Sequence, residues 1–160
     1  MNDGLKMKMQ GIEEMTKNLE KLGTRVALRG PAAAVRAGGS AIVKEMRSRA
    51  PKETGSLKKS MGQKVKTYRG NKTVTSIIGA RSKRYETSKG RRNPAYYAHL
   101  IELGVSPHRT GKKGGLHPGF AAAPFMRPAW DAAAPRARQA VIDKMQQVFE
   151  KEAAAVGVKS

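Results

Sequence analysis

Three histidines are the residues of this sequence best suited to metal binding, because neutral imidazole is a common metal ligand. His99 follows two tyrosines, while His108 and His117 lie in a glycine-rich stretch. No two of them have the short spacing of a helical metal site, and Glu102 is the one acidic residue near them in the sequence. The pattern therefore predicts loop or surface histidines and no metal centre.

Residues 111–115 form a glycine-rich segment around Lys112 and Lys113. The segment lacks the Gly-x-x-x-x-Gly-Lys-Ser/Thr spacing of a phosphate-binding loop, and no apolar strand leads into it. Acidic residues are sparse and scattered, so no pair indicates acid and base catalysis, and nothing marks a nucleophile elbow. The chain has no cysteine, which excludes thiol chemistry and disulfides. These observations predict a protein that is not an enzyme and needs no cofactor.

Positive charge is the strongest chemical signal in the chain. The net charge is +20, from 32 basic and 12 acidic residues, which is typical of a protein with a polyanionic partner. Between Lys44 and Arg92 there are 16 lysines and arginines against three glutamates, so most of the excess lies in the middle third. The basic residues predicted to contact a partner or DNA are Lys58, Lys59, Lys64, Lys66, Arg81, Lys83, Arg84, Arg91, Arg92, Arg109, Lys112 and Lys113.

Residues 32–60 organise the elements that must position these side chains. Val35, Ile42 and Met46 are seven and four residues apart, so they share one face of a helix. Pro51 disfavours helical backbone at the preceding residue, so the helix is expected to end there. A Thr-Gly turn then leads into a basic segment of alternating character.

The chain before this helix is predicted to hold a strand and a separate helix. Residues 5–9 alternate between apolar and polar side chains, as in a half-buried strand. The next apolar stripe, expected to pack in the core, is Ile12, Met15, Leu19 and Leu22, with Gly23 as its C-cap. A second helical region starts at Thr24, where Pro31 either opens the main helix or kinks a longer one. Gly38 and Gly39 cost the helix about 1 kcal/mol each, which a closely packed neighbouring backbone would explain.

Two strands joined by a turn are expected after the central helix. The first covers residues 58–68, with Met61, Val65 and Tyr68 facing inward, and the second covers residues 73–80, which are rich in β-branched side chains. The lysines of this hairpin leave two interpretations open, a solvated face that prevents aggregation and an anion-binding arm. Residues 81–93 show no apolar periodicity and are predicted to be a basic loop.

The last third of the chain is predicted to be mainly helical around a second long loop. Residues 94–104 fit a short helix ending at Gly104, although their alternation also permits a strand. Residues 105–120 form the second loop, long enough to be functional or to order on binding. The final helix has Pro128 in its first turn, a kink or restart at Pro135, and an apolar face of Val141, Met145, Val148 and Phe149.

These elements predict an α+β fold, in which a small antiparallel sheet packs against a long central helix and a C-terminal helix, with two long basic loops. Residues 1–152 form one domain and residues 153–160 a flexible tail. No uncharged run is long enough to span a bilayer, and no apolar segment of signal-peptide type is present, so no membrane contact is expected.

Three stretches make the chain similar to the tail-completion and head–tail joining proteins of long-tailed bacteriophages, a family of small tail components. They are residues 6–23, the helix end running from Arg49 to Ser60, and residues 97–104 followed after a loop by residues 124–129. The family-motif positions are Pro51, Thr54, Gly55, Leu57, Tyr97, Glu102, Gly104, Pro124 and Phe125. The sequence departs from the family pattern at two places. The family usually has an aromatic residue where this chain has Leu103, and a threonine soon after the glycine where this chain has Val105 and Ser106.

The resemblance implies a compact subunit that assembles with itself into a ring of six copies in the neck of the virion. Its partners would be the tail terminator and the head–tail connector, and double-stranded DNA would pass through the lumen. It would occur in the virion, and in the host cytoplasm during assembly. Charge alone supports a second hypothesis, a basic nucleic-acid-binding protein of histone-like or ribosome-associated type. The few aromatic residues and the lack of a known nucleic-acid module argue against this alternative.

Overall fold

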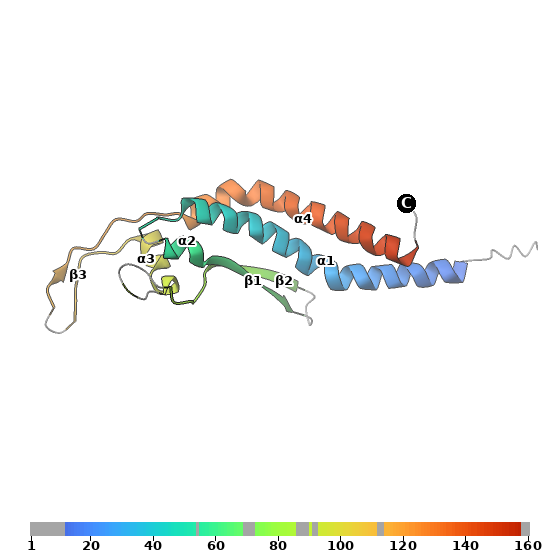
Figure 1. Ribbon diagram of the computed structural model, residues 1–160, viewed down its shortest axis with the longest axis horizontal. Helices are drawn as coiled ribbons and strands as arrows, with labels where there is room; N and C mark the ends of the chain where they lie inside the picture. Colours follow the sequence, from blue (N-terminus) through green and yellow to red (C-terminus); the bar gives the residue numbers. More distant parts are fainter. Residues whose placement is uncertain are drawn as a thin grey trace, which may run out of the picture.

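The computed structural model of the chain describes residues 12–53, 55–68, 73–85, 90, 93–111 and 114–157. Two long helices, α1 (Ile12–Arg49) and α4 (Met126–Val156), run side by side in opposite directions (Figure 1). Contacts between Glu45 and Arg136 near one end and between Arg29 and Glu152 near the other fix this antiparallel order. A hairpin of β1 (Met61–Tyr68) and β2 (Thr73–Ala80) packs on α1 as well. The predicted α+β class, with a two-stranded antiparallel sheet and two packed helices, is confirmed.

Helix α1 is longer than the pattern predicted. Gly23 does not cap it, and Pro31 lies inside it, so the predicted separate helix before Thr24 is wrong. Of the two alternatives for Pro31, the longer helix is the one observed. Figure 1 shows the axis of α1 changing direction part-way along, as happens where a proline removes a backbone N–H. The predicted end of the helix before Pro51 is confirmed, since α1 ends at Arg49.

The first turns of α1 are not packed in a core. Leu22 is buried, but Met15 and Leu19, predicted to share its core face, are 64% and 49% exposed. The physical reason is length, because α4 ends at Val156, and its Glu152 already lies beside Arg25 and Arg29. Figure 1 shows the blue start of α1 extending past the red end of α4. The predicted strand at residues 5–9 lies outside the described residues.

The hairpin starts later than predicted. Residues 58–60 belong to a short helix, α2 (Ser56–Ser60), which begins after Gly55 in the left-handed region with φ of 69°. The Ser60 hydroxyl donates to the Leu57 carbonyl, and the strand starts at Met61. The register pairs Met61 with Ala80 and Tyr68 with Thr73, and Tyr68 is exposed rather than inward. The predicted turn at residues 69–72 lies outside the described residues.

The core gathers where α1, α2, β1 and the start of α4 meet. Its members are Ile42, Val43, Met46, Ala50, Leu57, Met61, Ala98, Phe125, Ala129, Ala133 and Ala137. The three α4 members recur every four residues after Phe125 at the N-cap, so they form one face of the helix, and all three are alanine. Small side chains let the two helix backbones approach closely. The predicted apolar face at Val141, Met145 and Val148 is only half-buried, and Phe149 is exposed.

The chain between the sheet and α4 contains more regular structure than expected. The 3₁₀ turn η1 (Pro94–Tyr96) and helix α3 (Ala98–Leu103) confirm the helical alternative for residues 94–104. The predicted long loop at residues 105–120 contains short paired strands that the sequence did not predict, since β3 (His108–Arg109) pairs with β4 (Leu116–His117) and Val105 bridges Phe120. We call residues 105–111 and 114–120 the β-arm, which projects from the body of the molecule (Figure 1).

Helix α4 continues through Pro135 without a restart and extends to Val156. Ala153, placed in the predicted flexible tail, belongs to α4 and is buried. Gly157 ends the helix in the left-handed region with φ of 80°. The division into a domain at 1–152 and a tail at 153–160 remains a prediction.

Candidate functional site

The motif positions quoted for the family resemblance gather at one end of α1, around α2, α3 and the start of α4. Pro51, Gly55, Leu57 and Tyr97 line a shared cavity of about 230 Å³. The hydroxyls of Ser56 and Tyr97 are hydrogen bonded at 2.9 Å, which ties α2 to the turn before α3. Thr54 lies outside the described residues. The structure thus brings together residues that are more than 40 positions apart in the chain.

Gly104 holds the junction between α3 and the β-arm. Its backbone has φ of 75° and ψ of 174°, a region that only glycine occupies readily. A Cβ atom there would lie 2.7 Å from the Ala122 nitrogen and 3.0 Å from the Phe120 oxygen. The glycine at this motif position is therefore required both for its backbone conformation and for the space beside the returning chain.

Glu102 caps the start of α4 from α3. Its carboxylate accepts hydrogen bonds from the backbone N–H groups of Phe125, Met126 and Arg127, at 2.7, 2.9 and 3.1 Å. Burial raises the pKa of the Glu102 carboxyl, but these hydrogen bonds outweigh burial and the pKa lies below its ordinary value of 4.5. Two motif positions, Glu102 and Phe125, therefore form one structural unit that orients α4.

Replacing Glu102 by glutamine is expected to lower the free energy of unfolding by about 1 kcal/mol at neutral pH, as loss of a helix cap does. Since the pKa is lowered in the folded chain, the stabilisation is present above pH 4.5 and is lost as the pH falls through the folded-state pKa. The difference in the free energy of unfolding between the parent and Glu102→Gln should therefore shrink in acid. Urea denaturation at several pH values measures it, with Glu150→Gln on the exposed side of α4 as the control. A difference that stays constant below pH 4.5 would contradict the cap.

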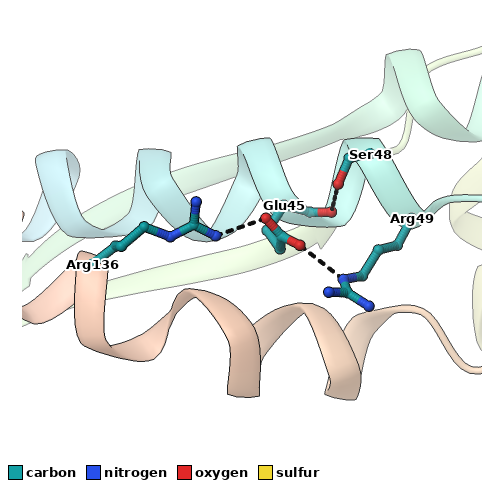
Figure 2. Close-up of polar contacts among 4 residues, drawn as sticks. All are labelled: Glu45, Ser48, Arg49 and Arg136. Carbon is teal, nitrogen blue, oxygen red and sulfur yellow. Dashed lines mark hydrogen bonds and ion pairs between the residues drawn. The ribbon is translucent and has the colours of Figure 1, made fainter.

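Glu45 joins α1 to α4 on the surface beside the core (Figure 2). Its carboxylate accepts hydrogen bonds from the Arg49 Nε at 2.9 Å and from the Arg136 Nη2 at 2.8 Å. Hydrogen bonds from Arg49 and then Arg136 hold the pKa of the Glu45 carboxyl below its ordinary value. Glu45 and Arg49 are four residues apart on α1, but the pairing of Glu45 with Arg136 of α4 could not be predicted from the sequence.

The basic residues predicted on the hairpin occupy two places. Lys64 and Lys66 lie on the exposed outer face of β1, opposite the face that packs on α1. Lys58 and Lys59 are exposed on α2. These lysines are therefore exposed on β1 and α2. Both interpretations left open by the sequence, a solvated face and an anion-binding arm, require this exposure.

The residues after β2 lie beside α2, where the Arg81 N–H donates to the Ser60 carbonyl and the Tyr85 hydroxyl donates to the Lys59 carbonyl. The Arg81 side chain lies over Gly62, where a Cβ atom would be 2.6 Å from its Nε. The Lys83 ammonium lies 5.9 Å from the centre of the Tyr85 ring, a cation–π contact. Arg84 is exposed. Arg91 and Arg92 lie outside the described residues.

The β-arm carries Arg109 and brings two histidines together. The rings of His108 and His117 stack across the paired strands with centroids 5.0 Å apart. Within the described residues, no group of three or more His, Cys, Asp or Glu could hold a metal ion. Lys112 and Lys113 lie outside the described residues. The sequence predicted these histidines as loop or surface residues. It did not predict that their rings stack, because the stacking depends on the register of the β-arm.

A basic hollow between α1, α2 and β1 was not predicted. It has a volume of about 450 Å³ and includes Lys44, Arg47 and Lys58 in its lining. The guanidinium of Arg47 donates two hydrogen bonds to the Met61 carbonyl, at 2.8 and 3.2 Å, and so anchors the start of β1. The sequence did not indicate this hollow, because the approach of Lys44 and Arg47 to Lys58 depends on how α2 packs against α1.

These features define a small α+β protein whose charge lies on its surface and on projecting elements. Residues 13–104, from α1 to the end of α3, match the model of a phage protein family described as "Bacteriophage HK97-gp10, putative tail-component". Because the match covers more than half of the 160 residues, the chain belongs to this HK97-gp10-like family. No curated protein and no solved structure gives a significant match.

Family membership confirms the resemblance read from the motifs and makes the chain a structural component of a phage tail. A tail component is part of the virion and works in contact with other virion proteins. Among the helices in the described part of the chain, none combines the length and the apolar character that a bilayer crossing requires. The Pro124–Phe125 stretch lies beyond the matched residues, although Glu102 connects it to them.

Proposed function

We propose that this chain is the subunit of a ring, of six copies, that completes the phage tail and joins it to the head–tail connector. Its neighbours are the tail terminator on one side and the connector on the other, and double-stranded DNA passes through the lumen. The protein acts through shape and charge and catalyses no reaction. Membership of the tail-component family over residues 13–104 is the observation that carries this proposal.

The placement of charge supports the proposal. Lys58, Lys59, Lys64, Lys66 and Arg84 are exposed on α2, on the outer face of β1 and after β2. The core of the subunit is apolar and does not include them. Exposed cations of this kind can face the DNA phosphates or an acidic surface of a neighbouring ring.

Electron microscopy of phage particles made without this chain tests the proposal directly. Separate full heads and complete tails are the expected result, because the joining ring would be missing. Normally joined particles would overturn the joining function, and salt-dependent DNA binding by the purified chain would then test the nucleic-acid alternative.

Changing Arg81, Lys83, Arg84, Arg91 and Arg92 to alanine is expected to impair particle joining or DNA contact while the domain stays folded. Arg81, Lys83 and Arg84 are exposed and lie outside the apolar core. The variant removes five positive charges from one segment. Joined particles are counted by electron microscopy, and folding is followed by thermal unfolding. Loss of cooperative unfolding would show that this segment supports the core.

A charge-matched control removes five bases from other parts of the chain, namely Arg36, Lys52, Arg127, Lys144 and Lys151. This control has the same net charge as the loop variant. Joining should be retained in the control if the position of the charge matters, and equal impairment would mean that net charge alone is responsible.

A further inference from the structure

An apolar groove lies along the middle of α1. Gly38 faces α4, where a Cβ atom would be 2.7 Å from Val141, and Gly39 faces the side chains of Gln63 and Ser76 on the hairpin. Consecutive helix positions are about 100° apart around the axis. The hairpin and α4 therefore pack on neighbouring sides of α1 and leave a groove between them, with α1 as its floor.

The groove has a volume of about 450 Å³ and a mainly apolar lining. Val35 and Ile42 belong to its floor, Ile78 to the β2 wall, and Trp130 and Ala134 to the α4 wall. Trp130 is 53% exposed and lies within this contiguous apolar lining, and a contiguous exposed apolar patch is typical of an interaction site. The groove therefore fits an apolar element with side chains spaced to enter it.

The same chain carries such an element at the start of α1. We define the overhang as residues 13–21, the part of α1 before the buried Leu22. Met15 and Leu19 are one turn apart and exposed on the same face. An amphipathic helix presenting apolar residues at positions i and i+4 is a recurrent ligand of apolar grooves.

Charge complementarity favours a second copy of this chain as the occupant. The overhang holds Glu13, Glu14 and Glu20 against two lysines, a net charge of −1 within a chain of +20. The groove includes the exposed Arg138 on its α4 wall. An apolar element of net negative charge thus matches an apolar groove with a basic edge, although two copies of so basic a chain repel each other elsewhere.

The overhang cannot fill the groove of its own chain. Leu19 and Gly38 lie on the same helix, 19 residues apart, which is about 28 Å at 1.5 Å per residue. We propose that the overhang of one copy docks into the α1–α4–β2 groove of the next copy. Such a contact joins two different surfaces, so it repeats from subunit to subunit and closes into a ring when the rotation allows. This inference rests on the proposed ring and assigns its subunit contact.

Disulfide trapping tests the contact on the full-length chain, which has no cysteine of its own. The double variant Leu19→Cys with Ala134→Cys is purified and oxidised at high protein concentration. A disulfide needs Cα atoms within about 7 Å, so a bond between these positions can form only between copies. The expected product is a series of disulfide-linked multimers on a non-reducing gel.

The matched control combines Ala134→Cys with Leu28→Cys, a fully accessible position on the same helix. Multimers no more abundant than in this control would overturn the proposal. Efficient dimers from Ala134→Cys alone would overturn it in favour of groove-to-groove contact, and efficient dimers from Leu19→Cys alone in favour of contact between overhangs.

Charge exchange adds a second readout. Glu14→Arg or Arg138→Glu alone should reduce the yield of linked multimers about fivefold, as loss of a surface charge pair does, and the two together should restore it. No rescue would overturn the placing of the acidic residues of the overhang beside Arg138. Counting joined particles in a Leu19→Glu phage separates this inference from the proposed function. If the double cysteine variant forms no disulfide-linked multimers, while phage lacking the chain still shows unjoined heads, the joining function stands and only this contact is overturned.

Discussion

Replacing Phe125 by alanine is expected to lower the free energy of unfolding by about 3–5 kcal/mol, the usual cost of deleting a buried phenylalanine. The Phe125 side chain is 2% exposed and lies in the core with Leu57, Met61 and Ala98. Its backbone N–H also donates a hydrogen bond to the Glu102 carboxylate, so Phe125 lies where α2, α3 and α4 meet. Chemical denaturation of the purified variant measures the loss.

Phe149→Ala is the matched control, because it removes the same side chain from the same helix at a half-exposed position. It should cost less than about 1 kcal/mol, as surface substitutions do. Equal losses in the two variants would mean that Phe125 is not part of the core. The measured difference thus reports how far the α3–α4 junction contributes to the stability of the whole subunit.

Replacing Gly38 by alanine is expected to destabilise the protein by about 1–3 kcal/mol, although alanine is the better helix former. The added Cβ atom would lie 2.7 Å from a Val141 methyl and 2.9 Å from the Ala137 carbonyl oxygen. The carbonyl belongs to the α4 backbone, so relief requires the two helices to move apart. Denaturation curves of the variant and the parent measure the change.

Gly23→Ala, on the same helix, is expected to change stability in the opposite direction. No heavy atom lies within 4 Å of a Cβ built at Gly23, and the position is exposed. Alanine should therefore stabilise α1 there by up to about 1 kcal/mol. If both variants changed stability in the same direction, close packing at Gly38 would not explain the glycine. Gly39→Ala should fall between them, because its nearest neighbours are the movable side chains of Gln63 and Ser76.

Local patterns predicted the elements well where the signal is short in range. The stop before Pro51, the strand over residues 73–80 and the helix over residues 94–104 all depend on φ restriction, β-branching or capping within a few residues. The same local reasoning failed at Gly23 and Pro31. A glycine or proline only weakens a helix, and packing against α4 can compensate for that cost.

The candidate site divides in the same way. Which bases lie on surface elements could be predicted, since charged side chains are seldom buried without a partner. The Glu102 cap, the Glu45–Arg136 pair and the stacked histidines could not, because each joins residues from separate elements. No spacing along the chain encodes such a pair when its members belong to elements whose packing is unknown.

The sequence by itself determined the class of protein, because charge, the absence of cysteine and the order of the motif stretches are properties of the chain alone. It also determined that an apolar stripe runs along the start of α1. Only the tertiary structure decided that this stripe is partly exposed, because the burial of Met15 and Leu19 depends on where α4 ends. The groove likewise exists only because α4 and the hairpin pack on neighbouring sides of one helix.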